Sequence, residues 1–174
     1  MNIFSKQHRQ QRELRVQAGM ESGIDWMATL ILQVLHDKYG FGRNRFAAMN
    51  EQWDKFNQEK EGIIFEWRDE LEQNGFSRPK AERIVEKLEK KITDRSKDWA
   101  VKKKTRDMLM GALIVTIHTL YTDYGFRKKR IADVLGYISD CAYVIYKNDV
   151  TIWEFMECMH QECAIEYPVL EEYC

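Results

Sequence analysis

One short pattern occurs twice in this chain, and the repetition restricts the folds that the chain can adopt. Residues 35–47 read Leu-His-Asp-Lys-Tyr-Gly-Phe-Gly-Arg-Asn-Arg-Phe-Ala, and residues 120–132 read Leu-Tyr-Thr-Asp-Tyr-Gly-Phe-Arg-Lys-Lys-Arg-Ile-Ala. A second pair of segments, 63–71 and 151–159, matches in kind farther along each copy. Two colinear matches at nearly the same spacing indicate an internal duplication, and such self-similarity is interpreted before other fold signals.

The repeat predicts an all-α protein built from two diverged copies of one helical unit. We place the copies at residues 20–75 and 105–165, joined by a charged helix over 77–104. Each copy consists of a helix, a Tyr-Gly-Phe corner, a second helix and a third helix. Two copies are too few for a solenoid, so we expect one helical domain over 1–174, a bundle with pseudo-twofold symmetry.

Apolar residues spaced by three and four positions predict where the long helices run. In the first copy the pattern predicts a helix over 24–39 after an N-cap at Ser22, and a separate basic helix over 5–18 before it. In the second copy the corresponding helix is predicted over 109–124, and the helix that follows its corner over 127–146.

Local signals mark the starts of three other helices. The second helix of the first copy should begin near Arg43, directly after the corner. Thr151 and Glu154 fit a capping box at the start of the last helix, and Gly62 begins the weaker counterpart in the first copy. Ser77 followed by Arg-Pro predicts the start of the charged helix, because proline is favoured in a first helical turn.

The Tyr-Gly-Phe triplets predict two sharp helix ends. A glycine directly after a helix adopts the left-handed backbone conformation that stops the helix, and the aromatic ring after it packs back on the last turn. This explanation is structural and needs no bound ligand. The corner residues are Tyr39, Gly40, Phe41, Tyr124, Gly125 and Phe126.

Basic side chains follow each corner, in the first turn of the next helix. The helix macrodipole disfavours a cation there by about 0.3–1 kcal/mol at an exposed site. Free backbone amides together with these cations predict a binding site for an anion or an acidic partner. The alternative is that the cations pair with acidic residues of the third helices, such as Asp69, Glu70 and Glu157. The basic residues are Arg43, Arg45, Arg127, Lys128, Lys129 and Arg130.

The net charge of −1 conceals a segregation of charge along the chain. Residues 78–106 hold twelve Lys and Arg against five Asp and Glu, whereas residues 148–174 hold seven acidic residues and no Lys or Arg. The basic segment is suited to an anionic partner, nucleic acid included. The near-zero total charge favours instead an arrangement in which the two segments face each other.

A helix, a glycine turn and a basic helix also suggest a DNA-binding helix-turn-helix. Reading bases requires suitable polar side chains along the second helix, but after Arg130 this helix carries Asp133 and Asp140. Nucleic acid would therefore be bound through its backbone phosphates, by the basic helix starts and the basic helix over 78–106.

Metal-ligand patterns in the sequence are weak. Glu157 and His160 have the Glu-x-x-His spacing of carboxylate-bridged di-iron bundles, but the matching positions of the first copy hold no histidine. His36 and His118 have no acidic partner at ligand spacing within their helices. We therefore predict no metal site, no cofactor and no catalytic residue, since no catalytic motif appears either.

The cysteines and the N-terminal segment predict a compartment. Cys141, Cys158, Cys163 and Cys174 all lie in the last quarter of the chain, whereas a secreted disulfide scaffold would spread its cysteines. Residues 1–15 are polar and basic and lack the apolar core of an export signal, and no apolar run is long enough to cross a bilayer. We expect a cytoplasmic protein with reduced thiols and no membrane partner.

The two corner strings, residues 35–46 and 120–131, resemble a motif of small uncharacterised all-helical proteins from prophages and mobile elements of Gram-positive bacteria. The resemblance implies a bacterial host cytoplasm and an accessory role, and it supplies no catalytic residue. We therefore predict a non-enzymatic protein that binds a macromolecular partner, preferably a host protein such as a defence protein. Nucleic acid is the alternative partner, and a carboxylate-bridged metal enzyme is the least favoured alternative.

Overall fold

A computed structural model describes residues 3–56, 63–94 and 96–167 of the chain. All regular structure within these ranges is helical, which confirms the all-α prediction. The helices are α1 (Ile3–Tyr39), α2 (Arg43–Phe56), α3 (Ile63–Gln73), α4 (Arg78–Ile92), α5 (Trp99–Thr122), α6 (Lys128–Lys147) and α7 (Ile152–Cys163). Among the described residues, no helix has both the length and the apolar character that a bilayer crossing requires.

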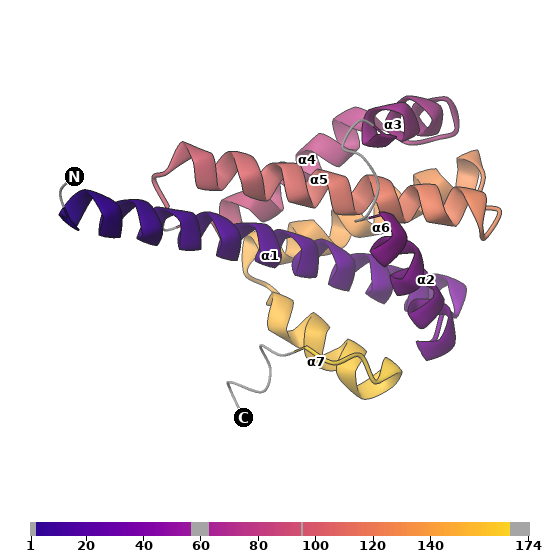
Figure 1. Ribbon diagram of the computed structural model, residues 1–174. Helices are drawn as coiled ribbons and strands as arrows, with labels where there is room; N and C mark the ends of the chain where they lie inside the picture. Colours follow the sequence, from indigo (N-terminus) through magenta and orange to yellow (C-terminus); the bar gives the residue numbers. More distant parts are fainter. Residues whose placement is uncertain (1–2, 57–62, 95, 168–174) are drawn as a thin grey trace.

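The two longest helices, α1 and α5, lie side by side and run in the same direction (Figure 1). Toward their N-terminal ends, the guanidinium of Arg12 lies 2.6 Å from the carboxylate of Asp98, the N-cap residue of α5. At their C-terminal ends, the ring of Tyr39 packs on the ring of Phe126, just beyond α5. Because N-terminal ends meet and C-terminal ends meet, the pairing is parallel.

Two glycines let α1 approach α5 closely. A Cβ atom at Gly19 would lie 2.6 Å from Oγ1 of Thr105, and one at Gly23 would lie 3.1 Å from the backbone oxygen of the same threonine. Both distances are shorter than ordinary carbon–oxygen contacts, so larger side chains would push the helices apart. The Gly-x-x-x-Gly spacing puts both glycines on one face of α1.

Each half of the chain covers the long helix of the other half. Helices α6 and α7 pack on α1, whereas α2 and α3 pack on α5. Helix α4 packs on α5 and α6. These contacts are reciprocal between the two units that the sequence predicts, while the duplication itself stays a prediction.

The core lies between these helices and consists of aliphatic and aromatic side chains. Its contributions from α1 and α5 fall at the predicted spacing of three and four. Helix α4 adds a narrower apolar stripe, as predicted. The buried residues of these three helices include Met27, Leu30, Ile31, Leu35, Ile84, Val85, Leu88, Leu109, Leu113, Ile117 and Leu120.

The predicted start of the first long helix is wrong. Helix α1 runs without interruption from Ile3, so Ser22 lies inside it and no separate helix covers 5–18. Gly19 and Gly23 weaken the helix signal in the sequence, because glycine has a low helix propensity. In the structure both glycines face α5, and packing on α5 keeps the helix continuous at these two positions.

The predicted limits of α5 and of the charged helix are also wrong. Helix α5 begins at Trp99 instead of Leu109, because the carboxylate of Asp98 accepts a hydrogen bond of 2.8 Å from a first-turn amide. The charged helix α4 ends at Ile92 and is therefore shorter than the predicted range of 77–104.

Two predicted helix starts are confirmed in detail. The Thr151 hydroxyl accepts from the amide of Glu154, and the Glu154 carboxylate accepts from the amide of Thr151 at 2.7 Å, which completes the capping box of α7. Ser77 is the N-cap residue of α4 and a proline follows in the first turn, although the Ser77 side chain makes no capping hydrogen bond. Gly62 lies outside the described residues.

Candidate functional site

The two corners have the same backbone shape. Gly40 has a φ of +63° and Gly125 a φ of +65°, both left-handed. The amide of Phe41 donates to the carbonyl of Leu35 at 3.1 Å, and the amide of Phe126 donates to a carbonyl equally far back, at 2.9 Å. Gly40 directly follows α1, as predicted, whereas α5 ends at Thr122, two residues before the predicted end, and Gly125 is left-handed in the turn that follows.

The aromatic rings of the two corners pack directly on each other. The ring centroids of Tyr39 and Phe126 are 4.9 Å apart, and those of Phe41 and Tyr124 are 5.0 Å apart. Each tyrosine thus contacts the phenylalanine of the other corner. Since tilted pairs at this separation are favourable, the corners hold the C-terminal ends of α1 and α5 together.

Hydrogen bonds across the corners are reciprocal as well. The hydroxyl of Tyr124 donates to the backbone oxygen of Arg45 at 3.3 Å, and the hydroxyl of Tyr39 donates to that of Arg130 at 3.5 Å. Burial raises the pKa of both tyrosines, so their hydroxyls remain protonated donors in neutral solution. Each second helix is therefore tied near its start to the opposite corner.

This arrangement gathers the predicted basic residues at one end of the molecule. We call Arg43, Arg45, Arg127, Lys128, Lys129 and Arg130 the basic corner. All six side chains are exposed. The turn before α4 packs closely on the start of α6: Gly75 has a φ of +100°, and a Cβ there would clash with the backbone of Lys128.

Three cations of the basic corner contact the corners themselves. The guanidinium of Arg45 lies over the ring of Phe41, at 4.9 Å from its centroid, and that of Arg130 lies over the ring of Phe126, at 5.5 Å. Arg127 donates to the backbone oxygen of Tyr121 at 2.8 Å and so satisfies a carbonyl at the end of α5. These contacts orient the cations without neutralising them.

No carboxylate of the described residues forms an ion pair with the basic corner, so the alternative explanation is wrong there. Asp69 pairs with Arg68 at 3.0 Å, and Glu70 lies 3.6 Å from Nε2 of His118. Glu157 accepts a hydrogen bond from the neighbouring turn of its own helix. Asp123 and Asp133 lie beside the basic corner. Burial is the main cause that raises the pKa of the corner tyrosines, and the negative charges of Asp133 on Tyr39 and of Asp123 on Tyr124 raise it further.

Among the described residues no ion pair joins the basic segment to the acidic segment, although Lys91 donates a hydrogen bond to the side chain of Asn148. In α7, Glu154 closes the capping box, and Glu162 lies 2.9 Å from Nε2 of His36 on α1. Four of the twelve cations over 78–106 form described ion pairs with acidic residues of α4 and α5. These pairs are Arg78–Glu82, Lys90–Glu86, Lys103–Asp107 and Arg106–Glu89.

His36 and His118 both have acidic partners from other helices, which the sequence analysis missed. His118 stacks on Trp67 with ring centroids 4.0 Å apart and faces Glu70. Burial lowers the pKa of His118, against the opposing effect of Glu70. No local spacing could reveal these pairs, because α3 and α7 reach the histidines only through the fold.

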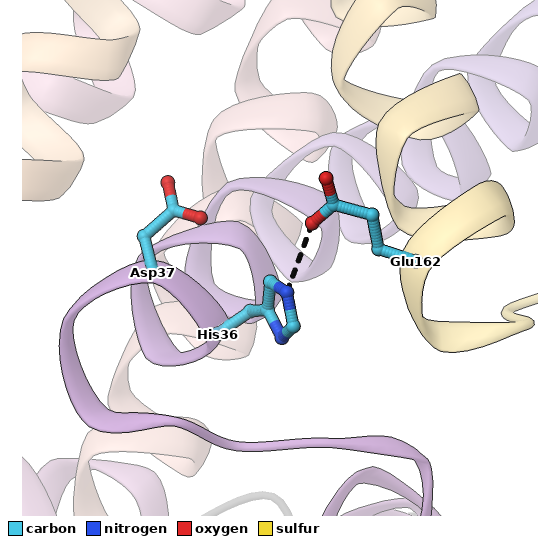
Figure 2. Close-up of side chains that lie close together, drawn as sticks. All are labelled: His36, Asp37 and Glu162. Atoms are coloured by element: carbon cyan, nitrogen blue, oxygen red, sulfur yellow. Dashed lines mark ion pairs between the residues drawn. The ribbon is translucent and has the colours of Figure 1, made fainter.

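His36 belongs to a cluster at the contact of α1 and α7 (Figure 2). Glu162 on α7 places Oε2 2.9 Å from Nε2, and with a carboxylate oxygen of the neighbouring Asp37 these ligand-type atoms lie within 4.8 Å of one another. Sγ of Cys163 lies 3.3 Å from Nδ1 of the same ring. The predicted Glu-x-x-His pair is not part of this cluster: Nδ1 of His160 lies 2.9 Å from the backbone oxygen of Ile165.

Comparison with known proteins identifies no relative of this chain: no family model, no curated protein and no solved structure matches it. The resemblance to prophage proteins therefore stays a prediction. What the site does is argued below from its own geometry and charge.

Proposed function

We propose that this protein is a non-enzymatic binding protein that recognises an acidic surface of a partner protein through its basic corner. The observation that carries the proposal is a group of six exposed cations, from the starts of α2 and α6, that pair with no described carboxylate. Unbalanced charge of one sign raises the local potential, which steers an oppositely charged partner and speeds its association.

The position of the cations supports a ligand over a purely structural role. A cation in the first turn destabilises its helix by about 0.3–1 kcal/mol, and the start of α6 carries Lys128, Lys129 and Arg130. The residue before them, Arg127, makes no capping hydrogen bond to these first-turn amides. An incoming carboxylate would gain both the amide donors and the cations.

A protein partner fits the surface better than nucleic acid does. A duplex needs a basic path that follows its phosphates, but Asp123 and Asp133 border the basic corner. The other basic region, over 78–106, is partly neutralised by its ion pairs. A compact acidic patch on a protein requires no such path.

The proposal extends to the biological setting that the sequence predicts. We propose a phage or mobile-element accessory protein whose partner is a host protein in the bacterial cytoplasm, a defence protein being one example. Cys141, Cys158 and Cys163 are free thiols in the structure, the form that a reducing cytosol maintains.

A charge-reversal experiment tests the binding proposal. The variant Arg43→Glu, Lys128→Glu, Lys129→Glu changes cations that make no described side-chain contact, and acidic residues in a first turn favour the helix. The variant should therefore be at least as stable as the wild type. The matched control, Arg83→Glu, Lys97→Glu, Lys104→Glu, makes the same charge change on α4, α5 and the segment between them.

Two measurements distinguish the possible partners. Fluorescence anisotropy with a poly-glutamate peptide and with duplex DNA, over a salt series, gives the affinity for each class of anion. Quantitative capture from a nuclease-treated bacterial lysate compares the variants on native partners. We expect the corner variant to lose binding by about tenfold or more, a difference of about 1.4 kcal/mol, and the control to retain it.

Three results would contradict the proposal. Equal loss of affinity in the corner variant and in the control would show that binding depends only on the net charge of the protein. Unchanged capture of partners by the corner variant would show that the basic corner does not bind them. Tighter binding of DNA than of the acidic peptide, with partners lost after nuclease treatment, would establish the nucleic-acid alternative.

A further inference from the structure

Three side chains of metal-ligand type share one space beside α1 and α7, and none belongs to the basic corner. His36 and Asp37 lie in the last turn of α1, and Glu162 lies in the last turn of α7. Figure 2 shows Glu162 reaching the His36 ring from the other helix, with Asp37 beside His36 on its own helix. The ligand atoms lie within 4.8 Å of one another.

The His36 ring is oriented with Nε2 toward this space. Nδ1 lies 2.8 Å from the backbone oxygen of Phe41, a contact that requires the proton on Nδ1, and Sγ of Cys163 at 3.3 Å is a weaker second acceptor. In the neutral ring Nε2 then carries a lone pair, 2.9 Å from Oε2 of Glu162. Two lone pairs at this distance repel unless a proton or a metal cation lies between them. A backbone carbonyl on the second ring nitrogen is the usual setting of a metal-bound histidine.

The described residues place no lysine or arginine against either carboxylate. Lys38, next along the chain, lies over the ring of Tyr137, at 5.0 Å from its centroid. Asp37 accepts one hydrogen bond, of 3.0 Å, from the side-chain amide of Gln33. Gln33 is only 7% exposed, and its Oε1 has no hydrogen-bond partner among the described residues. A bound cation would neutralise the two carboxylates.

We propose that His36, Asp37 and Glu162 bind one divalent cation of the zinc type. One imidazole and two carboxylates suit zinc, and three protein ligands leave a fourth position for water. Ligand atoms at about 2.1 Å from a tetrahedral ion stand about 3.4 Å apart, so Nε2 and Oε2, now 2.9 Å apart, must separate by about 0.5 Å. Both carboxylates are exposed, and rotation of their side chains permits this change.

The chain contains its own comparison for this site. His160, near the end of α7, places Nδ1 2.9 Å from the backbone oxygen of Ile165, as His36 does with Phe41. No carboxylate of the described residues pairs with Nε2 of His160, whereas Glu162 pairs with that of His36. His160 therefore has the orienting contact without the other ligands and serves as a matched control.

Metal titration of the full chain tests the inference. Protein treated with a chelator is titrated with Zn²⁺ by calorimetry and with Co²⁺ by visible absorption. We expect one ion per chain and an affinity that falls by at least about tenfold in Glu162→Gln. Glu157→Gln, on the same helix but outside the cluster, should bind as the wild type does. The Co²⁺ absorption should disappear in His36→Asn and persist in His160→Asn.

The following results would contradict the inference. Absence of stoichiometric binding by the wild type, or equal affinity in Glu162→Gln, would overturn it, and circular dichroism of the metal-free variants shows that they are folded. Loss of binding in Cys158→Ser with none in Glu162→Gln would assign the metal to the thiols instead. The test does not depend on the basic corner, so it stands apart from the proposed function.

Discussion

Gly40 and Gly125 carry the chain around the two corners in a left-handed conformation that other residues adopt only at a cost. A Cβ atom at either position would meet no atom within 4 Å. The penalty for a larger residue is therefore conformational, about 1–2 kcal/mol, without a steric contribution.

We expect Gly40→Ala and Gly125→Ala each to lower the free energy of unfolding by about 1–2 kcal/mol. Gly42→Ala is the matched control, because Gly42 also has open space around it but no left-handed φ. Urea unfolding followed by circular dichroism measures all three variants. An equal loss of stability in the control would show that the left-handed conformation is not the cause.

Residues whose role is local were predictable, and residues whose role depends on the fold were not. The corner glycines and the capping residue Thr151 act through hydrogen bonds to nearby residues, so the sequence alone identifies them. His36 and Cys163 are 127 residues apart in sequence, and no local pattern connects them. The basic corner lies between these cases: its residues were visible in the sequence, but their freedom from ion pairs required the structure.

Helix caps offer a test at the scale of a single element. Thr151→Ala removes the hydroxyl that accepts the amide of Glu154, and we expect a loss of about 1 kcal/mol in the free energy of unfolding. Ser77→Ala is the control, since Ser77 occupies the N-cap position of α4 but its side chain makes no capping hydrogen bond. Chemical unfolding should leave the control within a few tenths of a kcal/mol of the wild type. Equal effects would mean that the capping box contributes nothing.

Two glycines inside helices should respond differently to alanine, because Gly19 of α1 packs against α5 and Gly111 of α5 has more space around it. In Gly19→Ala the new methyl group would lie 2.6 Å from Oγ1 of Thr105, and overpacking of about 1–3 kcal/mol should exceed any gain in helix propensity. In Gly111→Ala the nearest atom would be 3.8 Å away, so the gain of about 0.5–1 kcal/mol should remain.

Thermal unfolding should therefore move in opposite directions for these two substitutions. The double variant Gly19→Ala, Thr105→Ala removes the atom that the new methyl group meets and should recover stability. A Gly19→Ala protein as stable as Gly111→Ala would show that the helices need no close approach.

The mistaken start of α1 has its physical origin in the contact with α5. Ser22 and Gly23 have low helix propensity, and their positions favour a helix boundary when only local sequence is considered. Packing against α5 outweighs that propensity and keeps α1 continuous. For α5 the earlier start has a local cause instead, the cap at Asp98.

At the scale of the whole molecule, the first half of the chain lacks a core of its own, whereas in the second half α4 packs on both α5 and α6. Helix α1 packs mainly on α4 through α7, while α2 and α3 pack on α5 (Figure 1). Residues 1–76 therefore hold three helices that have little contact with one another.

We expect a fragment of residues 1–76 to show no cooperative thermal transition by circular dichroism. Mixing it with a fragment of residues 77–174 should restore a cooperative transition, because the reciprocal contacts then form between the chains. The second fragment measured alone is the control. Cooperative unfolding of the first fragment in isolation would contradict this arrangement.

The parallel pairing of α1 and α5 also sets the order of events during synthesis. At about 5–20 residues per second, the 85 residues between corresponding positions on these helices take about 4–17 s to emerge from a ribosome. For that interval the nascent chain presents Leu30, Ile31 and Leu35 without the surface that later covers them. A chaperone that shields apolar helices would have its longest opportunity here, before the second half of the chain arrives.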